Sequence, residues 1–162
     1  MPYAFASHFA PDALMLALQV YHREFQPSPQ LKKPHAMVGV NVIAADTDAE
    51  AQRLFTSAQQ AFTNAVRGTR CQLPPPIDNI ESYWSPMEKA QASNMLACSF
   101  VGSPQTVRAG LEQFIVQTAA DELMVASAIY DHSARLYSYE LLTEIAESQH
   151  TQPSHPSPSV SN

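Results

Sequence analysis

The pair Ser7 and His8 ends a short aromatic segment that begins at Tyr3. A hydroxyl and an imidazole can both hydrogen-bond a ligand, which is the first interpretation of this pair. The second is that both side chains satisfy backbone groups of the loop that follows. Because no partner of defined geometry can be named beside His8, the pattern does not predict a catalytic base.

Two further polar side chains interrupt apolar segments. Asn41 lies within the run at 37–43, and Ser127 lies within the run at 123–129. A buried amide or hydroxyl needs a partner, and that partner is a neighbouring strand, a water molecule or a ligand. A ligand and a partner on a neighbouring strand both stay open for each residue.

Asp131 and His132 follow the last apolar run, which invites an acid–base interpretation. Adjacent side chains seldom face each other, so capping a helix that begins near Ser133 is the simpler role for this pair. Tyr83 and Trp84 form either part of a lid over an apolar pocket or a hydrophobic contact beside a helix N-terminus.

The cysteines and the last histidines indicate no metal site. Cys71 and Cys98 lie far apart, without a C-x-x-C motif or a nearby histidine pair, so neither zinc nor a disulfide framework is expected. His150 and His155 lie in a polar segment without convergent ligands. The sequence therefore predicts no metal ligand, and it names no catalytic residue.

The elements that position these groups follow from hydrophobic periodicity. Short apolar runs with aromatic or β-branched residues predict strands at 3–9, 35–45 and 123–129. Apolar residues at helical spacing, with capping boxes and Pro or Gly at the ends, predict helices at 11–25, 47–68 and 85–97 and two more that begin at 102–104 and 133. Residues 69–83, which contain three consecutive prolines, are expected to form a long surface connection.

Composition indicates one folded domain over residues 1–147. The 162 residues are 45% hydrophobic and 15% charged, with a net charge of −6 and no basic cluster beyond Lys32 and Lys33. Nucleic acid is therefore not an expected partner. With neither a membrane-length apolar run nor a signal peptide, the protein is expected to be cytoplasmic and not membrane-bound. The polar segment 148–162 is expected to be a disordered Ser/Pro-rich tail.

Alternating strands and helices predict the α/β class with a parallel sheet. Three strands cannot close a barrel, which takes eight, and a parallel sheet normally has both faces covered. The sequence therefore predicts that part of the sheet is supplied elsewhere.

Four segments in order carry a resemblance to a known family: PYAFASHFAP at 2–11, MVGVNVIAADTD at 37–48, VGSP at 101–104 and DELMV at 121–125. Over residues 2–147 the chain resembles the C-terminal half of bacterial luciferase-like, flavin-dependent monooxygenases. The resemblance implies the last three strands of a (β/α)8 barrel, with the proline-rich connection between the seventh and eighth strands.

The resemblance also implies a reaction. Reduced FMN, delivered by a flavin reductase, would react with O2 at the barrel mouth and oxidise an aldehyde or another small apolar substrate, and F420 in place of FMN stays open. Ser7, His8 and Asn41 would be cofactor-binding residues. Family members carry the phosphate site and the substrate-side residues on earlier segments, and this chain has no Gly-rich phosphate loop. We therefore expect a truncated chain that is inactive alone.

An alternative is a non-catalytic α/β half-barrel. Such a protein would act by pairing with a second copy or a companion chain, because exposed parallel strands are poor edges.

Overall fold

The computed structural model describes residues 1–7, 11–69 and 72–150. The four strands are β1 (Tyr3–Phe5), β2 (Ala36–Ala44), β3 (Ser99–Gly102) and β4 (Glu122–Ala126). The helices are α1 (Leu14–Glu24), α2 (Asp48–Val66), α3 (Pro86–Met95), α4 (Pro104–Thr118) and α5 (His132–His150), with 3-10 turns η1 (Pro11–Ala13) and η2 (Ile80–Ser82). The structure thus has the predicted alternation of strands and helices.

Strand β2 is the centre of a parallel sheet, because it pairs with each of the other three strands. The backbone N–H of Tyr3 in β1 donates to His35 O, and the backbone N–H of Asn41 donates to Cys98 O, just before β3. Backbone groups of alternate residues point to opposite edges of a strand, so β1 and β3 share one edge of β2, with β4 on the other. β1 pairs with residues 36–38, and β3 pairs with residues 41–44.

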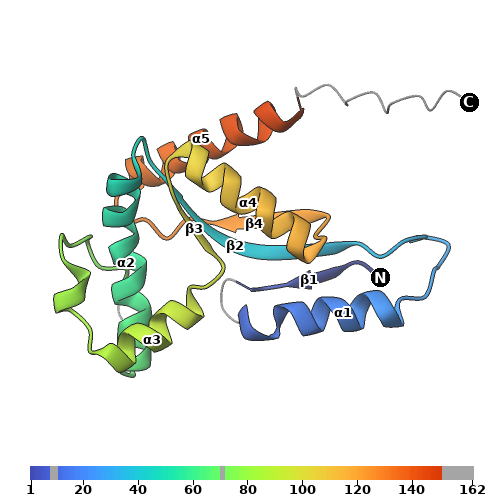
Figure 1. Cartoon of the computed structure of the whole chain (residues 1–162), viewed down its shortest axis with the longest axis horizontal. Helices are drawn as coiled ribbons and strands as arrows, with labels where there is room; N and C mark the ends of the chain where they lie inside the picture. The colour runs from blue at the N-terminus through green and yellow to red at the C-terminus, as the bar shows by residue number, and fades with distance from the viewer. Residues whose placement is uncertain (8–10, 70–71, 151–162) are drawn as a thin grey trace, which may run out of the picture.

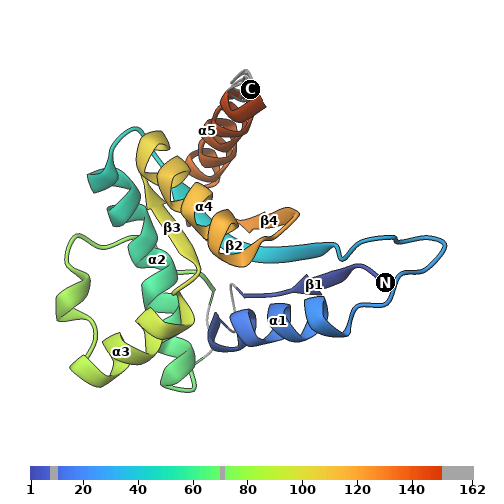
Figure 2. The same ribbon diagram turned by 45° about the vertical axis from the view of Figure 1, so that its right-hand side comes forward.

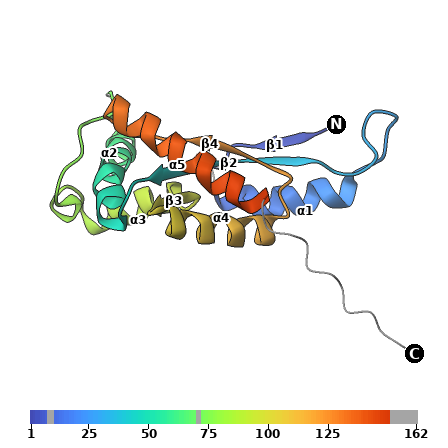
Figure 3. The same ribbon diagram turned by 90° about the horizontal axis from the view of Figure 1, so that it is seen from above.

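Helices α1, α4 and α5 cover one face of this sheet (Figures 1 and 3). The fully buried side chains of Val38, Val40 and Val42 point to this face and pack with apolar residues of those helices. Helix α1 runs beside β1 (Figure 2), where the rings of Tyr3 and Tyr21 stack with centroids 5.0 Å apart. Alternate residues of β2 point to the opposite, inner face.

The inner face is covered only at the carboxyl end of β2 among the described residues. There Ile43 packs with residues of α2, which stands across the strand ends (Figure 1). Nearer the amino end, Ala4, Ala6, Met37 and Met124 border a shallow apolar pocket of about 130 Å³ with Gly39 and Phe5. The side chain of Met124 is 57% exposed. A parallel sheet with one face this open is unusual.

The structure changes three strand predictions. β1 ends at Phe5 and β4 ends at Ala126, so Ser7 and Ser127 follow their strands instead of belonging to them. The sequence also predicted three strands, but the sheet has a fourth, β3, at Ser99–Gly102. Four residues between two helices give no clear period of two, so β3 was not recognisable except as the motif at 101–104.

The helices confirm the predicted capping box at Ser85, and at Thr47 they confirm the cap from the Thr47 hydroxyl. The Thr47 hydroxyl accepts the Glu50 N–H at 3.2 Å, and Ser85 and Glu88 form a reciprocal capping box with Pro86 at the first turn. Helix α5 extends to His150, past the predicted domain end at 147. The rest of the predicted tail, residues 151–162, lies outside the described residues, as does Cys71.

Candidate functional site

Ser7 lies beside the middle of β2, fully buried. Its hydroxyl donates a hydrogen bond to the carbonyl of Gly39. Gly39 lies between the stretch of β2 that pairs with β1 and the stretch that pairs with β3. The Ser7 hydroxyl therefore supplies the hydrogen bond that neither strand gives to the Gly39 carbonyl. The partner is strand backbone, not loop backbone. His8 lies outside the described residues.

Asn41 points to the inner face near the carboxyl end of β2 and is 6% exposed. Its Nδ2 donates to the Ser99 hydroxyl at 3.3 Å, so the amide links β2 to β3 through a side-chain hydrogen bond. The Asn41 amide thus has the partner on a neighbouring strand that one of the two interpretations predicted. This partner belongs to the strand that the sequence did not predict.

Two serines satisfy backbone groups on the other edge of β2. The Ser127 hydroxyl donates to the Val42 carbonyl at 2.6 Å, and the Ala44 N–H donates to the Ser138 hydroxyl at 2.9 Å. Both contacts lie beyond the point where β4 ends. Ser127 is thus engaged with a neighbouring strand, and the role of Ser138 in α5 had no signal in the sequence.

Cys98 precedes β3 and is a buried free thiol. Burial raises the pKa of this thiol, and a hydrogen bond with Ser7 opposes that shift without cancelling it. A raised pKa keeps the group protonated at neutral pH, so Cys98 is not an activated nucleophile.

Asp131 and His132 do not face each other as an acid–base pair. Asp131 Oδ1 accepts the Ala134 N–H at 2.8 Å, which confirms the capping role at the start of α5. His132 Nδ1 lies 2.9 Å from the Arg135 guanidinium one turn later.

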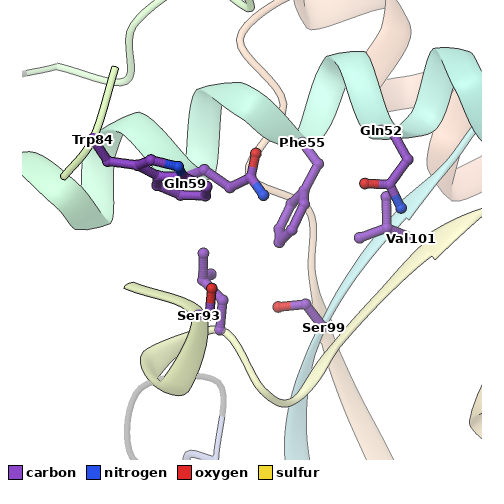
Figure 4. Close-up of a pocket in the computed structure, with 8 residues that line it drawn as sticks. Gln52, Phe55, Gln59, Trp84, Ser93, Ser99 and Val101 are labelled. Carbon is purple, nitrogen blue, oxygen red and sulfur yellow. The ribbon is translucent and has the colours of Figure 1, made fainter. Parts of the chain in front are cut away.

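Tyr83 and Trp84 take different positions beside α2. The Tyr83 hydroxyl donates to Asn64 Oδ1 at 2.8 Å, and its ring lies under the Arg67 guanidinium, 4.9 Å from the ring centroid. Trp84 borders a pocket between α2 and α3 (Figure 4). Tyr83 therefore makes a hydrogen bond and a cation–π contact where a hydrophobic contact was expected, and a pocket is present at Trp84.

The end of the motif at 37–48 contacts the motif at 101–104. Asp48 Oδ1 accepts the Ser103 N–H at 2.7 Å, and this bond, with hydroxyls of Thr106 and Ser103, lowers the pKa of the Asp48 carboxyl. A Cβ at Gly102 would lie 2.6 Å from Asp48 Oδ1. The contact ties the start of α2 to the start of α4, so these motifs have a structural role.

Comparisons with known proteins identify relatives of this chain. The chain is 50% identical over 147 residues to a "Luciferase-like monooxygenase" of Escherichia coli (strain K12), an alignment that covers 91% of the chain and 44% of the relative. Over 91% of its length the chain is a homologue of luciferase-like monooxygenases. A Bacillus subtilis relative, "Uncharacterized protein YvbT", is 46% identical over 145 residues, which is 90% of the chain and 43% of the relative. No family model matches the sequence.

Solved structures agree with this relationship. The structure of apo-MsnO8 superposes with a TM-score of 0.77 at 33% identity, over 91% of this chain and 45% of that one. An oxygenating constituent of 3,6-diketocamphane monooxygenase in complex with FMN, at 19% identity and a TM-score of 0.52, shows likeness of fold alone. The predicted class, a partial α/β barrel, is confirmed.

This luciferase-like chain spans less than half the length of the curated relatives it matches. The open inner face of its sheet agrees with that partial coverage. Within residues 1–7, 11–69 and 72–150, no helix combines the length and apolar character needed to cross a bilayer.

The described residues do not by themselves form a complete flavin site. The Ser7 hydroxyl is already bonded to Gly39, and the Asn41 amide is already bonded to Ser99. A flavin mononucleotide also needs groups for its phosphate, and the sequence offers no Gly-rich loop for that role.

Proposed function

We propose that this chain forms the C-terminal part of a flavin-dependent monooxygenase that oxidises a small apolar substrate with O2. The observation that carries the proposal is 50% identity to a luciferase-like monooxygenase over 91% of the chain. In such a reaction reduced FMN supplies two electrons, one oxygen atom enters the substrate and the other leaves as water. A flavin reductase is the proposed source of the reduced cofactor.

The proposed contribution of this chain is to shape one side of the barrel mouth. Asn41 supports this role because it lies on the inner face, near the carboxyl end of β2, where barrel enzymes bind their ligands. Ser7 contributes by holding the Gly39 carbonyl, which fixes the backbone of the strand that carries Asn41. His8 stays a proposed cofactor contact on sequence grounds.

We further propose that the chain is inactive alone and needs other strands beside it. The open surface around Met37 and Met124 supports this, because completing the barrel would bury it. The same surface favours the second candidate function, a non-catalytic half-barrel that associates with a second copy or a companion chain.

A chimera tests the proposed function. The matched segment of the Escherichia coli relative is replaced by residues of this chain, and product formation is followed with aldehydes, O2, reduced FMN and a flavin reductase. We expect the chimera to form the products that the parent relative forms, and the isolated chain to form none. A chimera that folds by circular dichroism but yields none of the parent's products would contradict the proposal. Self-association of the isolated chain by light scattering would favour the second candidate.

A further inference from the structure

A pocket lies between α2, α3 and β3, apart from the open inner face (Figure 4). Its volume is about 240 Å³. Since one water molecule occupies about 30 Å³ of the liquid, this space suits a compact organic molecule. The lining residues are Gln52, Phe55, Gln59, Trp84, Ser93, Leu96, Ser99 and Val101.

The lining of this pocket carries no ionisable side chain. Charged groups on the same part of the fold are engaged with one another, in the pairs Lys89–Glu81 at 2.8 Å, Arg53–Asp78 at 3.2 Å and Arg67–Glu88 at 2.7 Å. A charged ligand would lose hydration on entry and find no counter-charge in the lining. The pocket therefore favours an uncharged ligand.

Two carboxamides give the pocket its polar side. Gln52 and Gln59 are seven residues apart on α2, so they lie on one side of the helix with Phe55 between them (Figure 4). Within the described residues, neither carboxamide makes a hydrogen bond, and neither does the Ser93 hydroxyl across the pocket. Each carboxamide offers donors and an acceptor, so a ligand group with both functions pairs best with them.

Apart from the Ser99 hydroxyl, which accepts a hydrogen bond from Asn41, the remaining lining is apolar. Phe55 and Leu96 are buried core residues that form its inner wall, and the Trp84 indole closes one end. Such a wall suits a ring or a short branched chain.

We propose that this pocket binds an uncharged small molecule with an apolar body against Phe55 and Leu96 and a carboxamide-like group on Gln52 and Gln59. The proposal goes beyond the flavin-dependent function, and it requires no flavin. Trp84 is the only tryptophan of the chain, so its fluorescence reports directly on occupancy of the pocket.

The test is a titration of the full chain with cyclohexanecarboxamide, followed by Trp84 fluorescence. We expect a saturable change with a dissociation constant in the millimolar range or tighter. Cyclohexanecarboxylate, which has nearly the same shape and a negative charge, should bind at least about tenfold more weakly. Equal affinity for the two compounds, or no saturation up to the solubility limit, would overturn the proposal.

Two variants locate the binding. Gln59→Leu keeps the bulk and removes the hydrogen-bonding groups, so affinity should fall about tenfold. Ser93→Phe should fill the pocket and abolish binding. Gln113→Leu, at an exposed position of α4 outside the pocket, is the matched control and should bind like the native chain. If Gln59→Leu, still folded by circular dichroism, binds as tightly as the control, the pocket is not the site. Because no flavin is present, failure here would leave the chimera result unaffected.

Discussion

The hydroxyl of Ser7 donates a hydrogen bond to the carbonyl of Gly39, at the point of β2 between its pairings with β1 and β3. Both residues are buried. Through this contact Ser7, which follows the end of β1, joins the hydrogen-bonding ladder of β2. The position of β2 therefore depends on the Ser7 hydroxyl.

Replacing this hydroxyl should destabilise the fold. In Ser7→Ala the buried Gly39 carbonyl loses its partner, which costs about 1–3 kcal/mol in the free energy of unfolding. Urea denaturation measures the difference. Ser93→Ala, at an exposed hydroxyl without a hydrogen bond in the described structure, is the control and should change stability by less than about 0.5 kcal/mol. Equal stability of the two variants would contradict the role given to Ser7.

A side chain at position 102 should destabilise the fold. A Cβ there would lie 2.6 Å from Asp48 Oδ1 and 2.7 Å from the Thr106 side chain. Gly102→Ala must therefore displace the contact between the starts of α2 and α4, at a cost of about 1–3 kcal/mol. Gly68→Ala is the control, because Gly68 has a positive φ of 75° but open space around it, so only about 1 kcal/mol is expected. Thermal unfolding that ranks Gly68→Ala as the more damaging change would refute this account.

Acid should weaken the link between α2 and α3. Arg67 donates to Glu88 at 2.7 Å, and this bond, followed by the bonds from Ser85, lowers the pKa of the Glu88 carboxyl from 4.5 to about 2. A lowered folded-state pKa stabilises the fold fully above the unfolded-state value, and the contribution is lost as pH falls from about 4.5 to about 2.

The native chain should therefore exceed Glu88→Gln in melting temperature at neutral pH, with the gap closing across that window. Glu24→Gln, at an exposed glutamate at the end of α1, is the control for a general charge effect. A gap between the native chain and Glu88→Gln that stays constant down to pH 2 would show that the carboxylate does not act through its ionisation.

A charged side chain on the open inner face should leave the stability of the isolated chain unchanged, but it should prevent the folding of a complete barrel. Met124→Glu should change the stability of the isolated chain by less than about 0.5 kcal/mol, because the side chain is 57% exposed. In the chimera with the Escherichia coli relative the same change should prevent folding, because a carboxylate would be buried without a partner. Val116→Glu, 83% exposed on α4, should leave both proteins folded. A soluble, folded Met124→Glu chimera would contradict burial of this face.

The strands and helices whose hydrophobic pattern is long and regular could be predicted from the sequence. The β-branched run of β2 and the capped amphipathic helix α2 are the clearest cases, because each depends on local periodicity and local hydrogen bonds. β3 is different, since four residues become a strand only when β2 provides an edge. The partners of Ser7 and Asn41 lie 32 and 58 residues away, so their roles depended on a topology that no local pattern contains.

The sequence offered an apolar pocket at Trp84 as one interpretation, but the lining of that pocket could not be predicted, for a related reason. Its walls come from α2, the end of the proline-rich connection, α3 and the unpredicted strand. Gln52 and Gln59 look like ordinary solvent-facing residues of a helix in the sequence. Only the packing of α3 against α2 places both carboxamides over an apolar wall.

The most direct test of the central proposal is an FMN fluorescence titration of the isolated chain beside the chimera that supplies the remaining barrel. We expect no saturable quenching with the isolated chain at micromolar protein, since the Ser7 hydroxyl and the Asn41 amide already have protein partners, and saturable quenching with the chimera. F420 in a parallel titration distinguishes the two cofactors. Saturable micromolar binding of FMN by the isolated chain would contradict the proposal that its flavin site is completed by other strands.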